Sequence, residues 1–466
     1  MDCWNNFSCD YDCYFKNKIN PVYYETCDFG RWRKWVGAAL LGRKLGYEVF
    51  LSDKGTLADS YRNILREGGF DFEEGGHTEK RIFDADIVVK SPGIPDTVPM
   101  IVRLREEGIE VISEIEFAGR HSSAKHICIT GSNGKTTTTL LTHHILSRAG
   151  LDVGLAGNVG RSLAAQVAEN AHEVYVVELS SFQLDGMFRF RADIAVLTNI
   201  TPDHLDRYDH KFENYINSKF RILNNMRAED LFIYGKDSDA LVTKLKTLST
   251  EPKCVGFTYG EQSENCAAWM DGDWVKVILN DRKFQINKND ITIKGRHNVY
   301  NAMAAILACM QMDLSDEQIV DGLKTFPQVE HRLETVMTKD GVTYINDSKA
   351  TNVDSAWYAL DSMTGSVVWI AGGTDKGNDY SVLFDLVREK VKVLVCMGLD
   401  NHKLVQEFSP LCEVVDTASL DDAMKAVQQW AKPGDTVLLS PCCASFDLFK
   451  NYEDRGRLFK EAVRKL

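Results

Sequence analysis

Apolar and polar positions along most of the chain repeat with two alternating periods, and these periods predict where helices and strands lie. From Val36 the segment VGAALLGRKLGYEVFLSDKG places apolar residues on one face of a helix, stops at Gly46 and continues as a short apolar strand. Residues 36–119 keep this alternation, with further strands expected at residues 85–90 and 110–113. Strands that alternate with helices are typical of a small parallel sheet of the Rossmann type.

Two further α/β segments follow this first one. A polar joint at residues 120–125 leads to a central segment with buried strands expected at 126–130, 174–179 and 194–198. An Asp- and Asn-rich region at 265–290 predicts a β-hairpin insertion, and Pro327 marks a second joint. Residues 329–466 alternate strands and helices again. We therefore expect an α/β protein of three domains: Rossmann-like at 36–119, ATP-binding of the phosphate-loop type at 120–328, and doubly wound at 329–466.

The first 35 residues follow neither period and are dense in Cys, Trp, Tyr and Asn. The first βαβ unit consequently lacks its opening strand and glycine-rich turn. Back-translation of residues 24–35, read one base later, permits codons for MKRVILGGGESG, which would supply a start, a strand and a glycine-rich loop running into Val36. We therefore expect a frameshift near Trp35, so that residues 1–35 are out of frame, poorly ordered and without function. An intact reading frame in the source DNA would contradict this.

Composition narrows the classes of function. The 466 residues, 44% hydrophobic and 26% charged, are typical of a globular enzyme of several domains. A net charge of −13 argues against a nucleic-acid or membrane-surface binder, so cations that handle anionic substrates must gather in the site.

No apolar run is long enough for a membrane span and no signal-peptide pattern is present, so we expect a cytoplasmic protein. The 12 cysteines lack metal-type spacing and are expected to be reduced thiols.

A glycine-rich turn, GSNGKTT, lies between the strand expected at 126–130 and an apolar-periodic helix. Glycines let backbone N–H groups surround phosphate oxygens, and the helix N-terminus adds its dipole. Lys135 would reach the outer phosphates and the Thr136 hydroxyl suits Mg²⁺. The spacing departs from GxxxxGK(S/T), and the alternative is an ordinary strand–helix turn. The expected ATP-binding residues here are Gly131, Ser132, Asn133, Gly134, Lys135, Thr136 and Thr137.

Candidate metal ligands follow two other strands of the central segment. Glu178 ends the run VYVVEL, and His204 follows the run AVLTN by way of Ile200-Thr201-Pro202. The carboxyl ends of parallel strands meet at one crevice, where a carboxylate and an imidazole can hold Mg²⁺ between nucleotide and substrate. The alternative for each residue is a helix cap or a satisfied core histidine.

Seven motifs occur in the order seen in the Mur ligase family: GSNGKTT, ELSSFQLD, TNITPDHLDRY, GRHNVYNAMAA, EHRLE, NDSKATN and SPCCASFDLFKNYEDRG. The chain resembles this family over residues 36–466, and the last two motifs resemble its D-glutamate-adding members. The resemblance implies ATP-dependent ligation of D-glutamate to UDP-N-acetylmuramoyl-L-alanine through an acyl phosphate, in peptidoglycan synthesis and therefore in cell shape and division. The family's uracil-binding glycine-rich loop is absent.

The resemblance also implies roles for single residues. Lys219 stands where the family has a carbamylated lysine that binds a second Mg²⁺, although from the residues alone it would be a solvated helix lysine. Arg332 would stabilise the ATP phosphates, with Lys135, His204 and Lys219 completing the catalytic set. The remaining nucleotide contacts would be Asn298 and Asn301, which match the family's adenine-reading amides, and Asp347, which is placed for the ribose. Helix capping is an equal alternative for Asn298.

Substrate residues follow in the same way. Ser52, Asp53 and Ser91 end strands of the first domain, with ordinary turns as the alternative, and Asn158 corresponds to a contact with the nucleotide sugar. The D-glutamate pocket would comprise Thr351, Lys376, Ser445, Phe446 and Tyr452. We expect a monomer with small-molecule substrates and two Mg²⁺ ions, without nucleic-acid or membrane partners.

Three alternatives remain open. Another ligase of the superfamily, such as a folylpolyglutamate synthase, would use a different acceptor. A phosphate-loop ATPase without a ligase step would hydrolyse ATP independently of an amino acid. A pseudoenzyme could have lost substrate binding through its altered front end. In the ligase interpretation, Arg332 and Lys376 must approach the central site, so mobility is expected at both joints.

Overall fold

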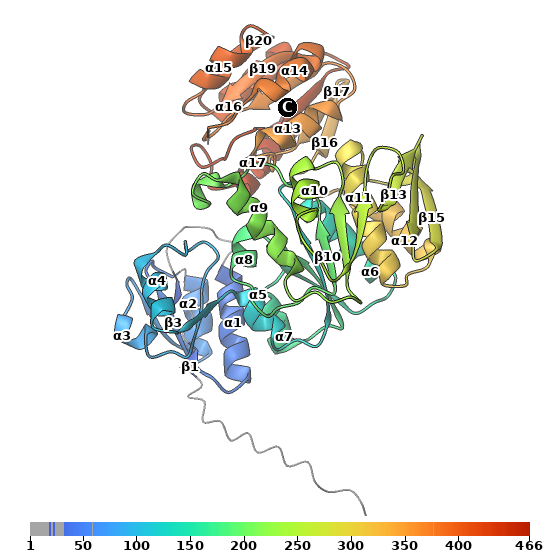
Figure 1. Cartoon of the computed structure of the whole chain (residues 1–466). Coiled ribbons are helices and arrows are strands. Elements are labelled where there is room, and N and C mark those ends of the chain that lie inside the picture. Colours follow the sequence, from blue (N-terminus) through green and yellow to red (C-terminus); the bar gives the residue numbers. More distant parts are fainter. Residues whose placement is uncertain (1–17, 20–21, 24–31, 58, 376) are drawn as a thin grey trace, which may run out of the picture. The chain divides into compact units, whose positions relative to one another are not determined.

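The computed structural model describes residues 18–19, 22–23, 32–57, 59–375 and 377–466, and Figure 1 traces them in sequence colours. The chain forms two compact units. The first comprises Met1–Lys125, Gly154–Tyr175 and Leu179–Arg191, and the second comprises His126–Val153, Val176–Glu178 and Ala192–Leu466. The described residues form three sheets with helices between their strands. The predicted three-part α/β class is therefore confirmed.

The first sheet is parallel and has the order β2-β3-β1-β5-β6, with β4 paired to β3. Phe50 and Val88 of this sheet are buried in one core with helix residues such as Ile101. The strands are β1 (Lys18–Ile19), β2 (Val22–Tyr23), β3 (Glu48–Asp53), β4 (Asp71–Glu74), β5 (Ile87–Val89) and β6 (Glu110–Ile112). The helices are α1 (Trp32–Lys44), α2 (Asp59–Glu67), α3 (Glu79–Ile82), α4 (Pro99–Glu106) and α5 (Glu114–Gly119).

Two short pieces of residues 1–35, the stretch expected to be poorly ordered, form strands of the first sheet. Lys18–Ile19 pairs in parallel with both β3 and β5, which is the place of the missing first strand, and α1 begins at Trp32 rather than Val36. Main-chain groups make these sheet hydrogen bonds, so an extended segment of almost any sequence can supply them. The other residues before Trp32, apart from 22–23, lie outside the described residues. The proposed frameshift concerns the DNA and stays a prediction.

The central sheet has nine strands in the order β15-β14-β13-β12-β11-β10-β7-β9-β8. The expected hairpin insertion is present, since β13, β14 and β15 pair antiparallel. The strands are β7 (Lys125–Thr130), β8 (Val153–Gly157), β9 (Val174–Glu178), β10 (Ile194–Leu197), β11 (Leu231–Gly235), β12 (Lys253–Phe257), β13 (Cys266–Asp271), β14 (Trp274–Leu279) and β15 (Arg282–Asn287). The helices are α6 (Lys135–Arg148), α7 (Leu163–Glu169), α8 (Ser181–Asp185), α9 (Phe212–Phe220), α10 (Asp239–Leu245), α11 (Arg296–Gln311) and α12 (Asp316–Thr325).

The third sheet has the order β16-β17-β21-β18-β19-β20, and only β16 in it runs antiparallel. Apolar residues are buried on both of its faces, as expected for a doubly wound domain. The strands are β16 (Glu334–Lys339), β17 (Val342–Asn346), β18 (Val367–Ala371), β19 (Val391–Met397), β20 (Glu413–Thr417) and β21 (Thr436–Leu439). The helices are α13 (Val353–Asp361), α14 (Phe384–Lys390), α15 (His402–Phe408), α16 (Leu420–Trp430) and α17 (Tyr452–Arg464).

Two sequence-based expectations can be compared with the described residues as a whole. Within them, no helix combines the length and the apolar character needed to cross a membrane. The eight described cysteines are free thiols, as expected, and each is at least partly buried. Cys3, Cys9, Cys13 and Cys27 lie outside the described residues.

Candidate functional site

The turn between β7 and α6 has the geometry of a phosphate-binding loop. Gly131 has φ 147° and Gly134 has φ 81°, and both values lie in the region that favours glycine. A Cβ atom at Gly131 would lie 2.0 Å from Thr198 Oγ1, and one at Gly134 would lie 2.3 Å from Asn301 Oδ1. The backbone therefore needs glycine at both positions, for its conformation and for the space around it.

Lys135, the first residue of α6, folds back onto this loop. Its ammonium donates hydrogen bonds to the carbonyl oxygens of Gly131 at 2.8 Å and Ser132 at 2.7 Å. Burial lowers the pKa of Lys135, and the negative charges of Glu178 and Asp203 act in the opposite direction. The cation is thus held among the loop carbonyls and faces the acidic groups at the ends of neighbouring strands.

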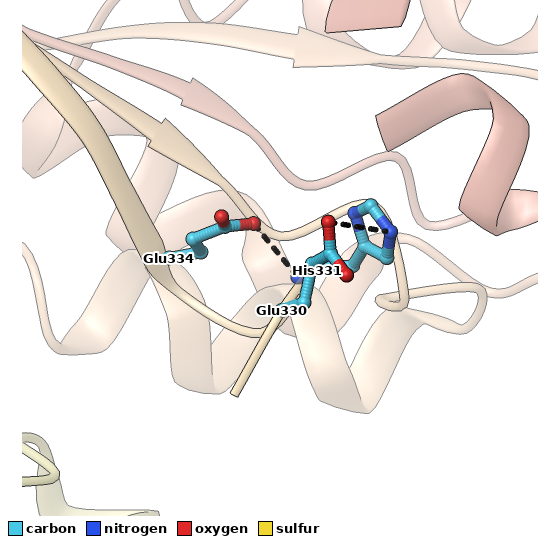
Figure 2. A group of neighbouring side chains, drawn as sticks. All are labelled: Glu330, His331 and Glu334. Carbon is cyan, nitrogen blue, oxygen red and sulfur yellow. Dashed lines mark hydrogen bonds and ion pairs between the residues drawn. The ribbon is translucent and has the colours of Figure 1, made fainter. Parts of the chain in front are cut away.

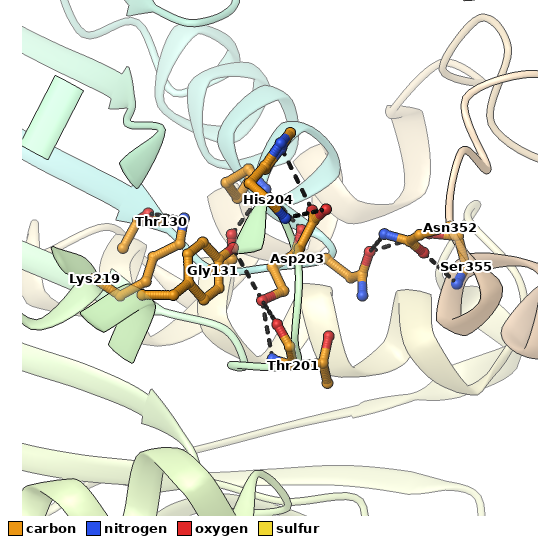
Figure 3. A network of polar contacts seen from close by, with 12 residues as sticks. Thr130, Gly131, Thr201, Asp203, His204, Lys219, Asn352 and Ser355 are labelled. Atoms are coloured by element: carbon orange, nitrogen blue, oxygen red, sulfur yellow. Dashed lines mark hydrogen bonds and ion pairs between the residues drawn. The ribbon is translucent and has the colours of Figure 1, made fainter. Parts of the chain in front are cut away.

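The segment after β10 holds the loop in place. Ser132 Oγ donates to Thr201 O at 2.9 Å and accepts from Thr201 N at 2.9 Å. Asn133 N donates to Asn199 Oδ1 at 2.9 Å, while Thr198 Oγ1 donates to Asn133 O at 2.6 Å. The run TNIT, which leads to His204, is therefore also the brace of the loop, and its last residue, Thr201, is labelled in Figure 3.

The C-terminal part of the chain also contacts the loop. Asn352 Nδ2 and Ser355 Oγ donate to Asn133 Oδ1 at 3.3 and 3.0 Å (Figure 3). Asn352 also caps α13, because its side chain accepts from Ser355 N at 2.9 Å. The motif NDSKATN thus ends in a residue that touches the GSNGKT turn.

Three of the expected metal ligands lie around the loop. Glu178 is buried at the end of β9, and its charge acts on Lys135. His204 has φ 54°, and its Nε2 lies 3.6 Å from Asp203 Oδ2. Lys219 in α9 is only 1% exposed, and its ammonium donates to Thr130 Oγ1, the last residue of β7, at 3.1 Å. A solvated helix lysine is therefore the wrong description of Lys219.

The two asparagines of α11 are both buried. Asn298 Nδ2 donates to Lys294 O at 2.8 Å, and Asn301 Nδ2 donates to Asn298 Oδ1 at 3.3 Å. The N-cap of α11 is Gly295, so the capping alternative for Asn298 is wrong. Asn301 lies against Gly134 and so joins this helix to the phosphate loop.

Asp347 and Arg332 lie close together beside the third sheet, since Leu333, next to Arg332, hydrogen-bonds the Asp347 carboxylate. Asp347 follows β17, and its carboxylate accepts from Ser440 Oγ at 2.9 Å and from Leu333 N at 3.2 Å. Burial raises the pKa of Asp347 to about 7. The positive charge of Arg332 acts on Asp347, on Lys135 and on Lys349, so its guanidinium lies among the groups of the candidate site.

Four of the five expected D-glutamate residues are described. Ser445 is buried, Phe446 is 68% exposed, and Tyr452 opens α17 beneath the ammonium of Lys349. Thr351 belongs to the tight turn after β17, where its N donates to Lys349 O at 2.9 Å. Lys376 lies outside the described residues.

The expected nucleotide-sugar residues lie at the carboxyl ends of strands in the first unit. Ser52 is fully buried, with its hydroxyl 2.6 Å from both Glu73 Oε1 and His77 Nδ1. Asp53 Oδ1 accepts from Gly55 N at 2.7 Å. Ser91 and Asn158 follow β5 and β8, and Asn158 is exposed. The Ser52 hydroxyl is committed to internal partners, which the sequence did not indicate.

Models of known families match three stretches of the chain: MurD N-terminal domain at residues 29–99, Mur ligase middle domain at 129–309, and Mur ligase glutamate ligase domain at 331–443. The UDP-N-acetylmuramoylalanine–D-glutamate ligase of Bacteroides fragilis is 52% identical over 92% of this chain and 97% of its own length. The same-named protein of Christiangramia forsetii is 50% identical with the same coverage. The chain belongs to the Mur ligase family. As a Mur ligase it is an ATP-dependent enzyme that forms a carbon–nitrogen bond.

Solved Mur ligase structures share the fold at low sequence identity. UDP-N-acetylmuramate–alanine ligase from Thermotoga maritima is 18% identical with a TM-score of 0.60, and it covers 96% of this chain and 99% of its own. A pseudomurein peptide ligase type C from Methanothermus fervidus, with the same identity and coverage, has a TM-score of 0.61. At this identity the likeness concerns the fold alone.

Of four further residues of this Mur ligase site, Asp203 and Lys349 were named from the sequence only as neighbours of His204 and Thr351, and Asn199 and Arg455 were not singled out. Asp203 faces Lys135, Asn199 braces the loop, and Lys349 stacks on Tyr452. Arg455 is buried, and its guanidinium donates to Ser348 O at 2.9 Å and to Cys443 O at 3.3 Å. Asp203 lies in the motif TNITPDHLDRY and Lys349 in the motif NDSKATN, so these motifs could have indicated both residues. Asn199 and Arg455 act through contacts far apart in sequence.

Proposed function

We propose that this chain joins D-glutamate to UDP-N-acetylmuramoyl-L-alanine at the expense of ATP, a step in peptidoglycan precursor synthesis. The observation that carries the proposal is the near full-length identity of about half with proteins that bear this activity in their names. The arrangement of Lys135, Glu178 and Arg332 around the glycine-rich loop supports it independently of the names.

The reaction starts with two anions, a carboxylate and a triphosphate. The substrate carboxylate oxygen attacks the γ-phosphorus, the bond to the β–γ bridging oxygen breaks, and an acyl phosphate and ADP form. The amine of D-glutamate then attacks the acyl carbon, loses a proton and expels inorganic phosphate. Lys135 and Arg332 bind and neutralise the phosphate oxygens during both steps.

The residues present fit Mg²⁺. Oxygen and nitrogen donors from Thr136, Glu178 and His204 are of the kind that bind this ion. Bound there, the ion would supply positive charge to the phosphate oxygens and the substrate carboxylate. A second ion would need another anionic ligand, and we propose that a carbamate on Lys219 provides it.

The burial of Lys219 supports the carbamate. A buried ammonium is costly, whereas addition of CO₂ to the neutral amine, with loss of a proton, gives an anion suited to a metal. The ¹³C NMR spectrum of the protein in ¹³CO₂-saturated buffer should contain a carbamate resonance that Lys219→Met removes. Lys244→Met, which alters a partly exposed lysine of α10, is the control, and a resonance unaffected by Lys219→Met would contradict the proposal.

The remaining assignments form part of the same proposal. Adenosine would be bound by Asn298, Asn301 and Asp347. D-glutamate would be bound by Thr351, Lys376, Ser445, Phe446 and Tyr452, and the nucleotide sugar by Ser52, Asp53, Ser91 and Asn158. We propose domains at 36–119, 120–328 and 329–466, a monomeric state and a cytoplasmic location.

Phosphate release measured with UDP-N-acetylmuramoyl-L-alanine, ATP and each amino acid in turn tests the function. We expect release that depends on both acceptor and D-glutamate, and mass spectrometry should find the amide product. Release without an amino acid would favour an ATPase, and release with a folate acceptor and L-glutamate would favour a folylpolyglutamate synthase. A second chain beginning MKRVILGGGESG before Val36 should bind the nucleotide sugar more tightly if residues 1–35 are out of frame.

A further inference from the structure

The backbone on both sides of Arg332 is in an unusual conformation. His331 has φ 62° and Leu333 has φ 42°, so two residues with Cβ atoms occupy the left-handed region around one arginine. Such residues cost free energy and persist only where neighbouring groups hold them, and they cluster at functional sites. Neighbouring groups must therefore hold Arg332 in this turn.

Four main-chain hydrogen bonds fix the turn. His331 N donates to Glu334 Oε2 at 2.9 Å, and Leu333 N donates to Asp347 Oδ1 at 3.2 Å. Arg332 N donates to Val329 O at 3.2 Å, and His331 O accepts from Lys349 N at 3.1 Å. Three N–H groups and one carbonyl of the turn are thus tied to the first residue of β16, to the loop after β17 and to Val329 just before the turn.

Side chains fix the imidazole and Glu334 as well. Asn346 Nδ2 lies 2.9 Å from His331 Nδ1 and 3.0 Å from Glu334 Oε2. A Cβ atom on Gly456 of α17 would lie 2.2 Å from His331 Nδ1, so the ring packs directly on the helix backbone. His331 is consequently held from the sheet and from α17.

Lys460 of α17 completes this arrangement. Its ammonium forms an ion pair with Glu330 and another with Glu334 at 2.9 Å, and the lysine side chain is only 10% exposed. Glu330, His331 and Glu334, drawn in Figure 2, have ligand atoms within 4.8 Å of one another, as a metal site would. The ammonium of Lys460 already supplies the positive charge for this cluster. We therefore interpret the cluster as an ion-pair network that supports the turn, and not as a metal site.

The side chain of Arg332 contrasts with its fixed backbone. Within the described part of the chain its guanidinium makes no hydrogen bond or ion pair, yet its charge acts on Lys135, His297 and Lys349. The backbone is therefore ordered while the cation remains available to an anionic ligand, which reduces the entropy lost when that ligand binds.

We propose that Lys460, Glu334 and His331 are positioning residues that aim Arg332 at the phosphates of ATP. Lys460 neutralises and orients Glu334, Glu334 holds the N–H of His331, and the resulting left-handed turn presents the guanidinium. This proposal rests on the proposed ligase function for its activity readout, whereas its nucleotide-binding readout does not.

The test is a double-mutant cycle between Lys460→Met and Arg332→Ala. Lys460→Met should lower kcat/KM for ATP roughly tenfold, since small misplacement of a positioned group is costly. In the Arg332→Ala background it should cause less than a twofold further loss, because Arg332 is the group through which it acts. Calorimetric affinity for a non-hydrolysable ATP analogue should follow the same non-additive pattern.

Matched variants separate positioning from general damage. Lys425→Met, which removes an exposed ion pair with Asp422 on α16, should leave both readouts unchanged, and Lys460→Arg should restore them. If Lys460→Met does not fold, Glu334→Gln, which weakens the ion pair with Lys460, takes its place in the cycle. Equal losses in both backgrounds, or full activity of the folded variant, would overturn the proposal. An inactive wild type that still binds the analogue would instead count against the ligase function.

Discussion

The ammonium of Lys349 lies 3.5 Å from the centre of the Tyr452 ring. The lysine belongs to the loop after β17 and the tyrosine opens α17, so this cation–π contact joins two motifs that are about a hundred residues apart. Burial lowers the pKa of Lys349 to about 8, and the nearby charge of Arg332 contributes to the decrease. A lysine that can lose its proton at a mildly alkaline pH thus lies within the electrostatic reach of Arg332, Glu178 and Lys135.

The first prediction concerns pH. Lys349 carries its charge below its folded pKa and loses it as the pH rises through about 8. We expect kcat/KM to fall on this alkaline limb, because the cation would no longer stabilise the anionic acyl phosphate. Lys349→Arg should move the limb to higher pH in a measured pH–rate profile. An unchanged alkaline limb in this variant would assign the titration to another group.

Lys135→Ala should lower the rate of phosphate release by about 100-fold or more, because a preorganised cation on the phosphates is lost. Lys211→Ala, which changes an exposed lysine just before α9, should have no effect. The rate is measured with all three substrates present. Ligation by Lys135→Ala within tenfold of the wild type would refute the role of this loop.

Gly134→Ala should weaken ATP binding and reduce the free energy of unfolding by roughly 2–4 kcal/mol, since strain from positive φ adds to a steric clash. Gly272→Ala is the matched control, because Gly272 has φ 60° but no atom lies within 4 Å of the added Cβ. It should cost only about 1 kcal/mol. Equal losses in urea unfolding would mean that the contact with Asn301 is unimportant.

Asp347→Asn should change how stability depends on pH. Burial raises the pKa of Asp347 to about 7 in the folded state, so the folded protein holds this proton more tightly than the unfolded chain. The free-energy penalty of keeping this carboxylate charged in the folded protein is absent at low pH, grows as the pH rises from about 4 and is complete above about 7, at on the order of 4 kcal/mol. Urea unfolding at about pH 5 and about pH 7.5 should show a larger decrease for the wild type than for the variant. Equal decreases in the free energy of unfolding for the wild type and for the variant would contradict a raised pKa of Asp347.

How much of the site could be predicted depends on how local each feature is. The turn 131–137 was recognisable because strand, glycines, Lys135 and helix are consecutive. The burial of Lys219 could not be recognised, because the apolar period of α9 indicates which face of the helix is buried but not which residues cover it. The meeting of Asp347 with Ser440 requires β17 and β21 to be neighbours, and the Lys460 ion pair with Glu330 spans 130 residues. Strand order and helix packing depend on contacts between residues that are far apart in the sequence, and a single sequence does not predict them.

The place of the first strand shows a similar limit. The gap between β3 and β5 could be foreseen from the period of residues 36–119, but its occupation by Lys18–Ile19 could not. Register is set by the turn and the side-chain pattern, whereas the backbone hydrogen bonds are common to all sequences. A two-residue strand carries almost no pattern of its own.

The hydrogen bonds that Lys135 makes to Gly131 and Ser132 hold its ammonium against the glycine-rich loop. A triphosphate that binds here would not have to order a lysine that is free in solvent. It would replace two carbonyl oxygens as the partners of an ammonium that already lies at the loop. The side chain of Lys135 would then lose little conformational entropy on binding. The binding free energy would reflect the difference between the ammonium's interactions with phosphate oxygens and with carbonyl oxygens, not the full strength of either interaction.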